Sequence, residues 1–235
     1  MNQSVDGGTH EGLIRAYLHA KEVIVRAGFG SEIDWQDHVR FEGITESDFL
    51  REYAWVVFSA GMRESVVRMK FAGISCAFLD WKSAADIAQN AHACQARALA
   101  IINHPGKVAG VVTAAQRIAS EGFGVIRDRV KSEGCQELRA LPFIGPVTVY
   151  HLAKNIGLDV VKPDRHLCRV ASATGFSTAS DLCQTIAGYV GDRLSVVDLV
   201  IWRFATLDRE YRFHFSAAVK PAVRRAVSGS HGATW

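Results

Sequence analysis

The sequence predicts an all-α protein, and three observations support this fold class. Apolar residues recur at the three- and four-residue spacing of a helix along almost the whole chain. Joints that contain glycine or proline, such as 104–106 and 121–122, separate the helical stretches. Only Val160 and Val161 have strand character, and a single strand has no partner with which to form a sheet.

Apolar spacing and capping residues define the helices of the first half. Residues 12–26 are expected to form a helix because Leu13 and Ile24 fall on one face. The polar run 45–48 offers side-chain oxygens that cap a helix N-terminus, so the next helix is expected over 48–59. The same periodicity predicts helices over 63–69, 83–89, 94–103, 108–120, 123–132 and 135–141.

Residues 141–148 read Leu-Pro-Phe-Ile-Gly-Pro-Val-Thr, which predicts a tight turn between two helices. The chain would turn through Pro142 and Gly145. The second helix is expected over 147–156, with Pro146 in its first turn, where the missing N–H of proline has no intrahelical role. Such a turn leaves N–H groups pointing outward at a helix N-terminus, which suits a DNA phosphate.

An acidic residue follows this second helix. Gly157 is expected to end the helix, and residues 160–163 to be extended, because a residue that precedes a proline is pushed out of the helical region. Asp164 therefore opens the next helix, over 165–174, as an N-cap. Apolar spacing predicts the remaining helices over 179–189, 195–206 and 221–227.

The two segments together resemble the helix-hairpin-helix DNA glycosylase superfamily, the endonuclease III-like enzymes. That family has a Leu-Pro-Gly-x-Gly hairpin, a helix, and then an aspartate segment of the Val-Asp-x-His type. The matching residues are Leu141, Pro142 and Gly145 in the hairpin, and Asp164 and His166 in the aspartate segment. The resemblance covers about half of the chain.

The resemblance implies an architecture of two helical lobes. Residues 55–63 look like the family's early apolar helix, which runs into a Ser-Ala turn. Residues 52–157 would form a barrel-like lobe containing the hairpin, and residues 1–51 plus 158–235 a second lobe carrying Asp164. The active cleft would lie between the lobes, with this aspartate at its mouth.

The resemblance also implies that Asp164 is catalytic. Departure of a base from its deoxyribose builds positive charge on the sugar, and a fixed carboxylate stabilises that charge and orients the attacking water. The base must first leave the stack, because no side chain reaches the C1′ atom inside a duplex. A plain helix N-cap is the other explanation of Asp164, and the two roles are compatible.

Two departures from the family pattern bear on the chemistry. Bifunctional relatives have a lysine just after the hairpin, whose amine attacks the sugar and leads to strand cleavage. Here that position is Val147, and neither Lys154 nor Lys162 matches it, so we expect a monofunctional enzyme. Phe143 replaces the usual glycine, which limits how closely the backbone approaches a phosphate.

The predicted DNA-binding surface combines the hairpin, the Ser-Ala turn and the neighbours of Asp164. Relatives have a glutamine after the Ser-Ala turn to fill the hole left by a flipped base. Gly61 stands there in this chain, and Met62 is the expected apolar wedge, although core packing explains it equally well. The residues expected at the DNA are Leu141, Pro142, Phe143, Gly145, Val147, Thr148, Gly61, Met62, Arg63, Lys162 and His166.

The base pocket calls for aromatic side chains, because a flipped base stacks on their rings. Trp35 is the preferred candidate, since the segment around it is too polar for a buried helix. Tyr150 and His151, on the helix after the hairpin, are the others. Nothing indicates a metal or an organic cofactor, because no histidine pair or cysteine pair has ligand spacing. The cysteines, expected to be small buried hydrophobes, are Cys76, Cys94, Cys135, Cys168 and Cys183.

Charge and hydropathy restrict the partners. The net charge is only +3, so DNA binding requires a local basic face. Basic residues gather toward the C-terminus, although a solvated helix face explains each of them equally well; they are Arg203, Arg209, Arg212, Lys220, Arg224 and Arg225. No apolar run approaches the roughly 20 residues that span a bilayer, and no secretion signal is evident, so we expect an intracellular protein, cytoplasmic and nucleoid-associated in a bacterium.

These features predict a monomeric, monofunctional DNA N-glycosylase that flips and excises a damaged or modified base from double-stranded DNA. Alkylated purines fit, because a cationic leaving group needs little acid assistance. Excision of enlarged modified bases from invading viral DNA, as a defence activity, is one alternative. A non-catalytic helix-hairpin-helix DNA-binding module is another, and the presence of Asp164 favours the enzyme.

Overall fold

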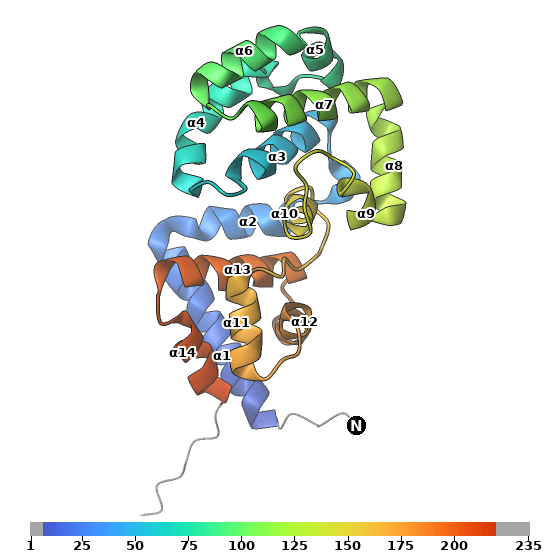
Figure 1. The fold of residues 1–235 in the computed structure, drawn as a ribbon. Helices are drawn as coiled ribbons and strands as arrows, with labels where there is room; N and C mark the ends of the chain where they lie inside the picture. Colours follow the sequence, from blue (N-terminus) through green and yellow to red (C-terminus); the bar gives the residue numbers. More distant parts are fainter. Residues whose placement is uncertain (1–6, 220–235) are drawn as a thin grey trace, which may run out of the picture.

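The all-α prediction is confirmed. A computed structural model of the chain describes residues 7–219, which contain helices and no strand (Figure 1). None of the helices in this range is both long enough and apolar enough to cross a membrane. The predicted helix over 221–227, together with Lys220, Arg224 and Arg225, lies outside the described residues.

The helices run in the following order. The first part of the chain forms α1 (Gly7–Ile24), the π-helical turn η1 (Val25–Phe29), α2 (Gly30–His38), the 3-10 turn η2 (Phe41–Gly43), α3 (Glu46–Ser59), α4 (Glu64–Ala77) and the 3-10 turn η3 (Leu79–Trp81). The middle forms α5 (Ala84–Gln89), α6 (Ala91–Ile101), α7 (Pro105–Glu121), α8 (Phe123–Glu133), α9 (Cys135–Leu138) and α10 (Thr148–Asn155). The last part forms α11 (Arg165–Thr174), α12 (Ala179–Val190), α13 (Leu194–Leu207) and α14 (Tyr211–Val219).

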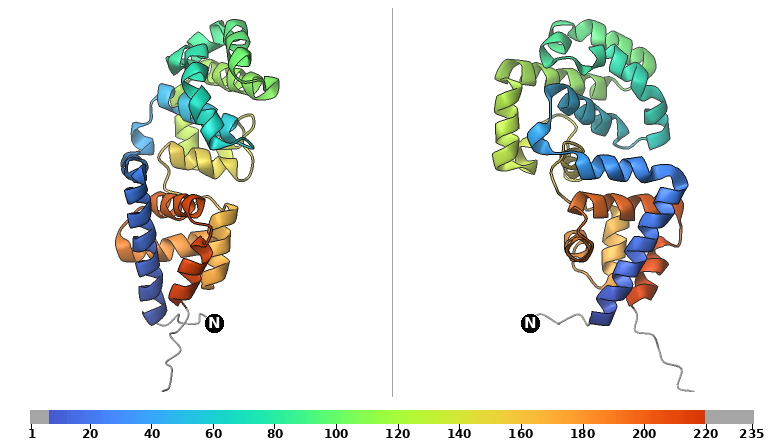
Figure 2. Two further views of the ribbon diagram at one scale, coloured as in Figure 1. Left: turned by 90° about the vertical axis from the view of Figure 1, so that its left-hand side faces the viewer. Right: turned by 180° about the vertical axis from the view of Figure 1, so that it is seen from behind.

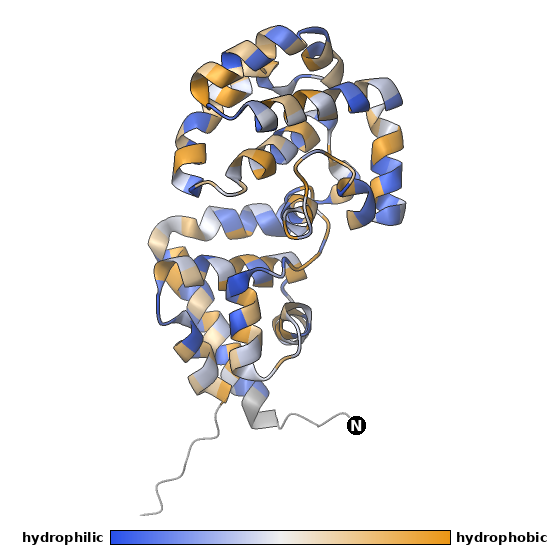
Figure 3. Cartoon of the chain, viewed as in Figure 1, coloured by the Kyte–Doolittle hydropathy of each residue, from blue (hydrophilic) through white to orange (hydrophobic). Residues whose placement is uncertain are grey.

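Buried apolar side chains form two separate clusters. The first, here called the upper core from its place in Figure 1, is built from residues 41–156. The second, the lower core, is built from residues 13–33 and 161–215, so it joins the two ends of the described chain. Figure 3 shows hydrophilic and hydrophobic residues alternating along α8 and α11, as expected for helices with one face against a core.

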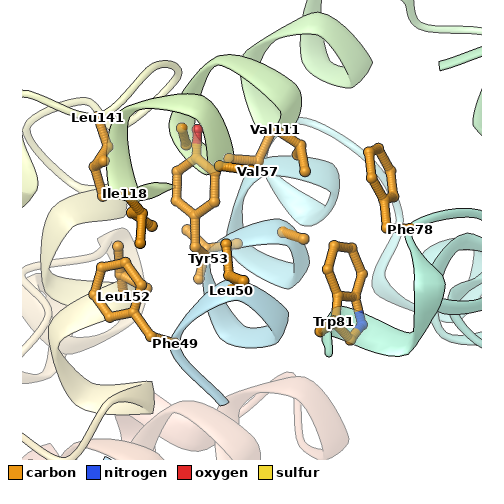
Figure 4. Close-up of a cluster of buried hydrophobic side chains, with 14 of the residues drawn as sticks. Phe49, Leu50, Tyr53, Val57, Phe78, Trp81, Val111, Ile118, Leu141 and Leu152 are labelled. Atoms are coloured by element: carbon orange, nitrogen blue, oxygen red, sulfur yellow. The ribbon is translucent and has the colours of Figure 1, made fainter. Parts of the chain in front are cut away.

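The upper core packs around α3, and this packing positions the hairpin. Figure 4 shows Phe49 and Tyr53 of α3 lying among Leu152 of α10, Leu141 and Ile118. The Tyr53 hydroxyl donates to the carbonyl oxygen of Pro142 at 2.8 Å. The turn between α9 and α10 is therefore fixed to α3 by apolar contacts and by a hydrogen bond that is shielded from water.

Polar contacts connect the two cores across α2. The Arg193 guanidinium donates to the carbonyl oxygens of Gln36, Val39 and Gly157 at 3.0, 2.7 and 2.9 Å. The Gln36 amide in turn donates to the carbonyl oxygen of Lys154 at 3.2 Å. These bonds satisfy backbone groups where the chain passes from one core to the other, so they restrict how the two cores move relative to each other.

Two helices differ from the sequence prediction. No helix was predicted around Trp35, and the segment forms α2, in which only Ile33 and Gln36 are buried, as expected for a segment too polar to be a buried helix. The second is α14, whose buried residues are only Tyr211 and Phe215. In α2 only Ile33 and Trp35 are apolar, which is too few to produce a helical periodicity. In α14 the aromatic residues Tyr211, Phe213 and Phe215 alternate with polar ones, and this spacing is not that of a helix.

Candidate active site and DNA-binding surface

The hairpin turn is built around buried and strained residues. Leu141 and Ile144 point into the upper core, while Phe143 between them is about half exposed. Phe143 has a φ of +62°, in the left-handed region that side chains rarely adopt. Glycine adopts this conformation without strain, so a phenylalanine at this position has to be held there by its side-chain contacts.

The Phe143 side chain contacts α7. Its ring lies over Gly106 and Gly110, so that a Cβ added at Gly110 would lie 2.7 Å from the ring. The imidazole of His104 stands edge-on to the ring with 6.3 Å between centroids. The left-handed conformation costs roughly 1–2 kcal/mol, which the ring contacts offset. Phe143 therefore attaches the hairpin to α7.

The start of α10 does not offer the N–H group that the sequence suggested. The Gly145 N–H was expected to face a phosphate, but it donates to the hydroxyl of Thr148 at 2.7 Å. Within residues 7–219, the N–H groups of Val147 and Thr148 have no acceptor. Pro146 has no N–H, and the side chain of Val147 is 44% exposed. An anion at this helix start would therefore bind to these two groups.

Asp164 caps α11 and keeps one carboxylate oxygen available. Its Oδ1 atom accepts hydrogen bonds from the N–H groups of His166 at 2.8 Å and Leu167 at 3.1 Å. Its Oδ2 atom has no partner among the described residues, and the residue is partly exposed. The N-cap interpretation is thus confirmed, and it leaves an oxygen that can face a ligand.

A buried ion pair supports the segment that carries Asp164. Asp198 of α13 and Lys154 of α10 form a salt bridge, with side chains only 2% and 8% exposed. The second oxygen of Asp198 accepts the Lys162 N–H at 2.6 Å. Three elements (α10, α13 and residues 160–164) are thereby joined two residues before Asp164. Sequence reasoning missed Asp198, although a single carboxylate in the apolar run of α13 implies a buried partner.

Two basic side chains next to this pair are perturbed. Burial lowers the pKa of Lys162, and the nearby carboxylate of Asp164 opposes the shift only in part. The amine of Lys162 has no hydrogen-bond partner within residues 7–219. Burial, with the charges of Lys162 and Lys154, lowers the pKa of His151 well below its usual range, so its imidazole is neutral near pH 7.

His166 connects the start of α11 to α14. Its Nδ1 atom lies 3.2 Å from the hydroxyl oxygen of Tyr211, and the two rings meet edge to face. The Nε atom of Arg165 lies 3.2 Å from the other ring nitrogen. Burial lowers the pKa of His166. The position of this imidazole is therefore fixed, which suits a positioning role near Asp164.

The turn after α3 is a braced loop at the edge of the upper core. Gly61 is exposed with a φ of +72°, Arg63 is exposed, and Met62 is partly buried against the upper core. The ammonium of Lys107, itself 6% exposed, donates to the carbonyl oxygens of Phe58 and Ala60. Core packing thus accounts for part of the Met62 side chain, and its remaining surface is open to a ligand.

Trp35 is not brought together with the other predicted pocket residues. It lines a hollow of about 430 Å³ with Glu52 and Asn155, and neither Asp164 nor Tyr150 lines that hollow. Burial raises the pKa of Glu52, whose carboxylate accepts a hydrogen bond from the Asn155 amide at 3.0 Å. Tyr150 packs against the upper core instead.

The cysteine prediction is corrected in part. Cys94 and Cys183 are buried, Cys135 is intermediate, and Cys76 and Cys168 are exposed. Along residues 7–219, no three histidine, cysteine, aspartate or glutamate side chains are grouped so that they could hold a metal ion.

The predicted residues that do share one side of the molecule are the hairpin and the start of α11, as Figures 1 and 2 show together. This side offers open N–H groups for an anion and a carboxylate held by a helix. Such a set can bind a phosphodiester and stabilise positive charge nearby. Comparison of the chain with protein-family models, curated proteins and solved structures gave no match.

Proposed function

We propose that the protein is a monofunctional DNA N-glycosylase, with two helical lobes built on the upper and lower cores and the flipped nucleotide bound between them. The observation that carries this proposal is the carboxylate of Asp164. One of its oxygens is held by the N-terminus of α11 and the other has no partner among the described residues. An anion fixed in this way needs no reorganisation when positive charge develops on the sugar.

The surroundings of Asp164 support this role. The open N–H groups of Val147 and Thr148 at the start of α10 provide a phosphate site on the same side of the molecule. The Asp198–Lys154 pair holds the segment just before Asp164 through the Lys162 N–H. DNA gripped at the hairpin would thus be placed against a carboxylate whose position is fixed.

The test is single-turnover excision by Asp164→Asn. Asparagine keeps the shape and the cap but removes the charge, so release of free base should fall about a hundredfold or more. Asp181→Asn is the matched control, because Asp181 is an exposed aspartate in the first turn of α12. Duplexes with alkylated, oxidised or enlarged modified bases serve as substrates, and mass spectrometry detects the released base.

The outcomes separate the alternatives. Near-normal excision by a folded Asp164→Asn protein would refute the catalytic assignment. Duplex binding with no release from any substrate would favour the non-catalytic DNA-binding module. Release confined to enlarged modified bases would favour the defence role over repair.

A following strand-cleavage step is the second candidate activity, and Lys162 is the observation that favours it. Its amine has no partner among the described residues, and burial lowers its pKa, which increases the neutral, nucleophilic fraction. The monofunctional proposal, in which Val147 occupies the family's lysine position, predicts that borohydride traps no protein–DNA adduct on an abasic duplex, whereas the second candidate predicts a trapped adduct. A trapped adduct that disappears in Lys162→Ala would show that this amine forms the imine.

A further inference from the structure

A second hollow lies between α11 and α14, on the lower core. Its volume is about 550 Å³, and arginine side chains from both helices and from the connection before α14 line it. Figure 1 shows α11 and α14 next to each other, with the start of α11 turned toward the upper core. The lining residues are Cys168, Arg169, Ser172, Ala173, Arg209, Glu210, Arg212, Phe213 and Ser216.

The charge of this hollow is not neutralised within the described residues. Arg169, Arg209 and Arg212 are exposed and have no ion-pair partner between residues 7 and 219, and Glu210 is the one carboxylate that lines the hollow. Arg203 of α13, by contrast, donates hydrogen bonds to both carboxylate oxygens of Glu32. Three guanidinium groups against one carboxylate make this a local basic face on a chain of low net charge.

The fold holds these arginines close to Asp164. Arg169 is five residues further along α11, a rise of about 7.5 Å along the helix axis. At the start of α14, Tyr211 contacts His166 of α11, and the Asp208 carboxylate lies 2.9 Å from His214. Both contacts fix the segment that carries Arg209 and Arg212.

We propose that the α11–α14 hollow binds the phosphodiester backbone of DNA that flanks the nucleotide held at Asp164. This inference rests on the proposed function, because it assumes that the target nucleotide is bound at Asp164. A DNA strand has a phosphate every few ångströms, so a strand that passes Asp164 reaches the hollow within a few nucleotides. Guanidinium groups bind phosphate oxygens with two parallel hydrogen bonds.

The form of the hollow favours an extended polyanion over a single small anion. Its arginines are spread over α11, α14 and the connection that precedes α14. The ring of Phe213 among them is 65% exposed, and an exposed ring next to cations suits the apolar faces of sugars and bases. A free phosphate would use neither the ring nor all three arginines.

The first experiment measures the salt dependence of binding to an undamaged duplex. A triple variant, Arg169→Gln with Arg209→Gln and Arg212→Gln, removes the hollow's cations. If these arginines make three phosphate contacts, the negative slope of log affinity against log salt concentration should become shallower by about 2–3. The charge-matched control removes three exposed basic residues that lie on the upper core and have no ion pair within residues 7–219: Lys82→Gln, Arg97→Gln and Arg127→Gln.

A slope changed by the hollow variant and not by the control supports the proposal. Equal slopes for the hollow variant and the wild-type protein would overturn it. A polyglutamate peptide tests an acidic protein partner: loss of peptide binding in the hollow variant, with an unchanged DNA slope, would also overturn it.

The second experiment uses Cys168, the exposed thiol that lines the hollow. Duplexes with a disulfide-activated tether on one backbone phosphate should cross-link to it at one or two neighbouring tether positions, and Cys168→Ser should abolish the product. Cys76, exposed on α4, is the internal control. Cross-linking to Cys76 alone, or at no position, would contradict the proposal.

Both readouts use DNA without a target base, so they do not depend on excision. If the hollow binds DNA but the protein excises no base, the proposed DNA-binding hollow is supported and the proposed glycosylase activity is refuted. If the protein excises a base but the hollow variant binds DNA normally, the glycosylase activity is supported and the proposed DNA-binding hollow is refuted.

Discussion

Replacement of Asp198 by asparagine should destabilise the protein strongly, because it leaves a buried ammonium without its counter-ion. The side chains of Asp198 and Lys154 are 2% and 8% exposed, so water cannot replace the lost partner. Removal of one member of a buried pair costs about 3–5 kcal/mol. For a chain of this length, 1 kcal/mol corresponds to a change in Tm of roughly 2–4 °C, so the expected decrease is about 6–20 °C.

The assay is urea unfolding together with calorimetry, and the control is a second substitution. Lys154→Met removes the unpaired charge, and an asparagine at position 198 still accepts the Lys162 N–H. The double variant should therefore recover most of the loss, to within about 1–2 kcal/mol of the wild-type protein. If Asp198→Asn alone unfolded within 1 kcal/mol of the wild type, the pair would not be the buried junction described above.

Two further predictions concern the hairpin and the pH dependence of stability. Gly110→Ala places a Cβ 2.7 Å from the Phe143 ring and should lower the free energy of unfolding by about 1–3 kcal/mol. The control is Gly124→Ala, in open space on α8, which should be neutral or stabilising. Similar unfolding midpoints for both variants would refute the ring contact. The folded-state pKa of His151 lies well below 6.5, so below pH 6.5 the unfolded chain binds more protons than the folded one. The free energy of unfolding should therefore decrease as the pH is lowered, by at most about 1.4 kcal/mol per pH unit. His151→Gln should flatten this fall in urea titrations at pH 5 and 7.5, and an unchanged slope would show that this imidazole does not cause it.

The sequence was sufficient for residues whose role is local. The N-cap of α11 follows from Asp164 after a proline, and the hairpin turn follows from Pro142 and Gly145. Both depend on a few neighbouring residues, so tertiary contacts did not need to be known.

Residues whose role depends on distant partners could not be placed in the same way. Asp198 is joined to Lys154 across 44 positions, and Tyr211 to His166 across 45. Trp35 was assigned from the polarity of its segment alone, but the hollow that it lines is formed with residues of α3 and α10. Spacing along one helix gives its buried face, and it does not give the element that covers that face.

The lower core takes its helices from both ends of the described chain, and this has a consequence during synthesis. The apolar face of α1 becomes buried only after α13 has been synthesised, and α13 begins roughly 170 residues after α1 ends. At the usual rates of translation this is on the order of ten seconds or more, during which the upper core can already fold. A nascent chain thus exposes Leu13, Tyr17 and Ile24 for that period, which makes α1 the segment that a chaperone would bind first.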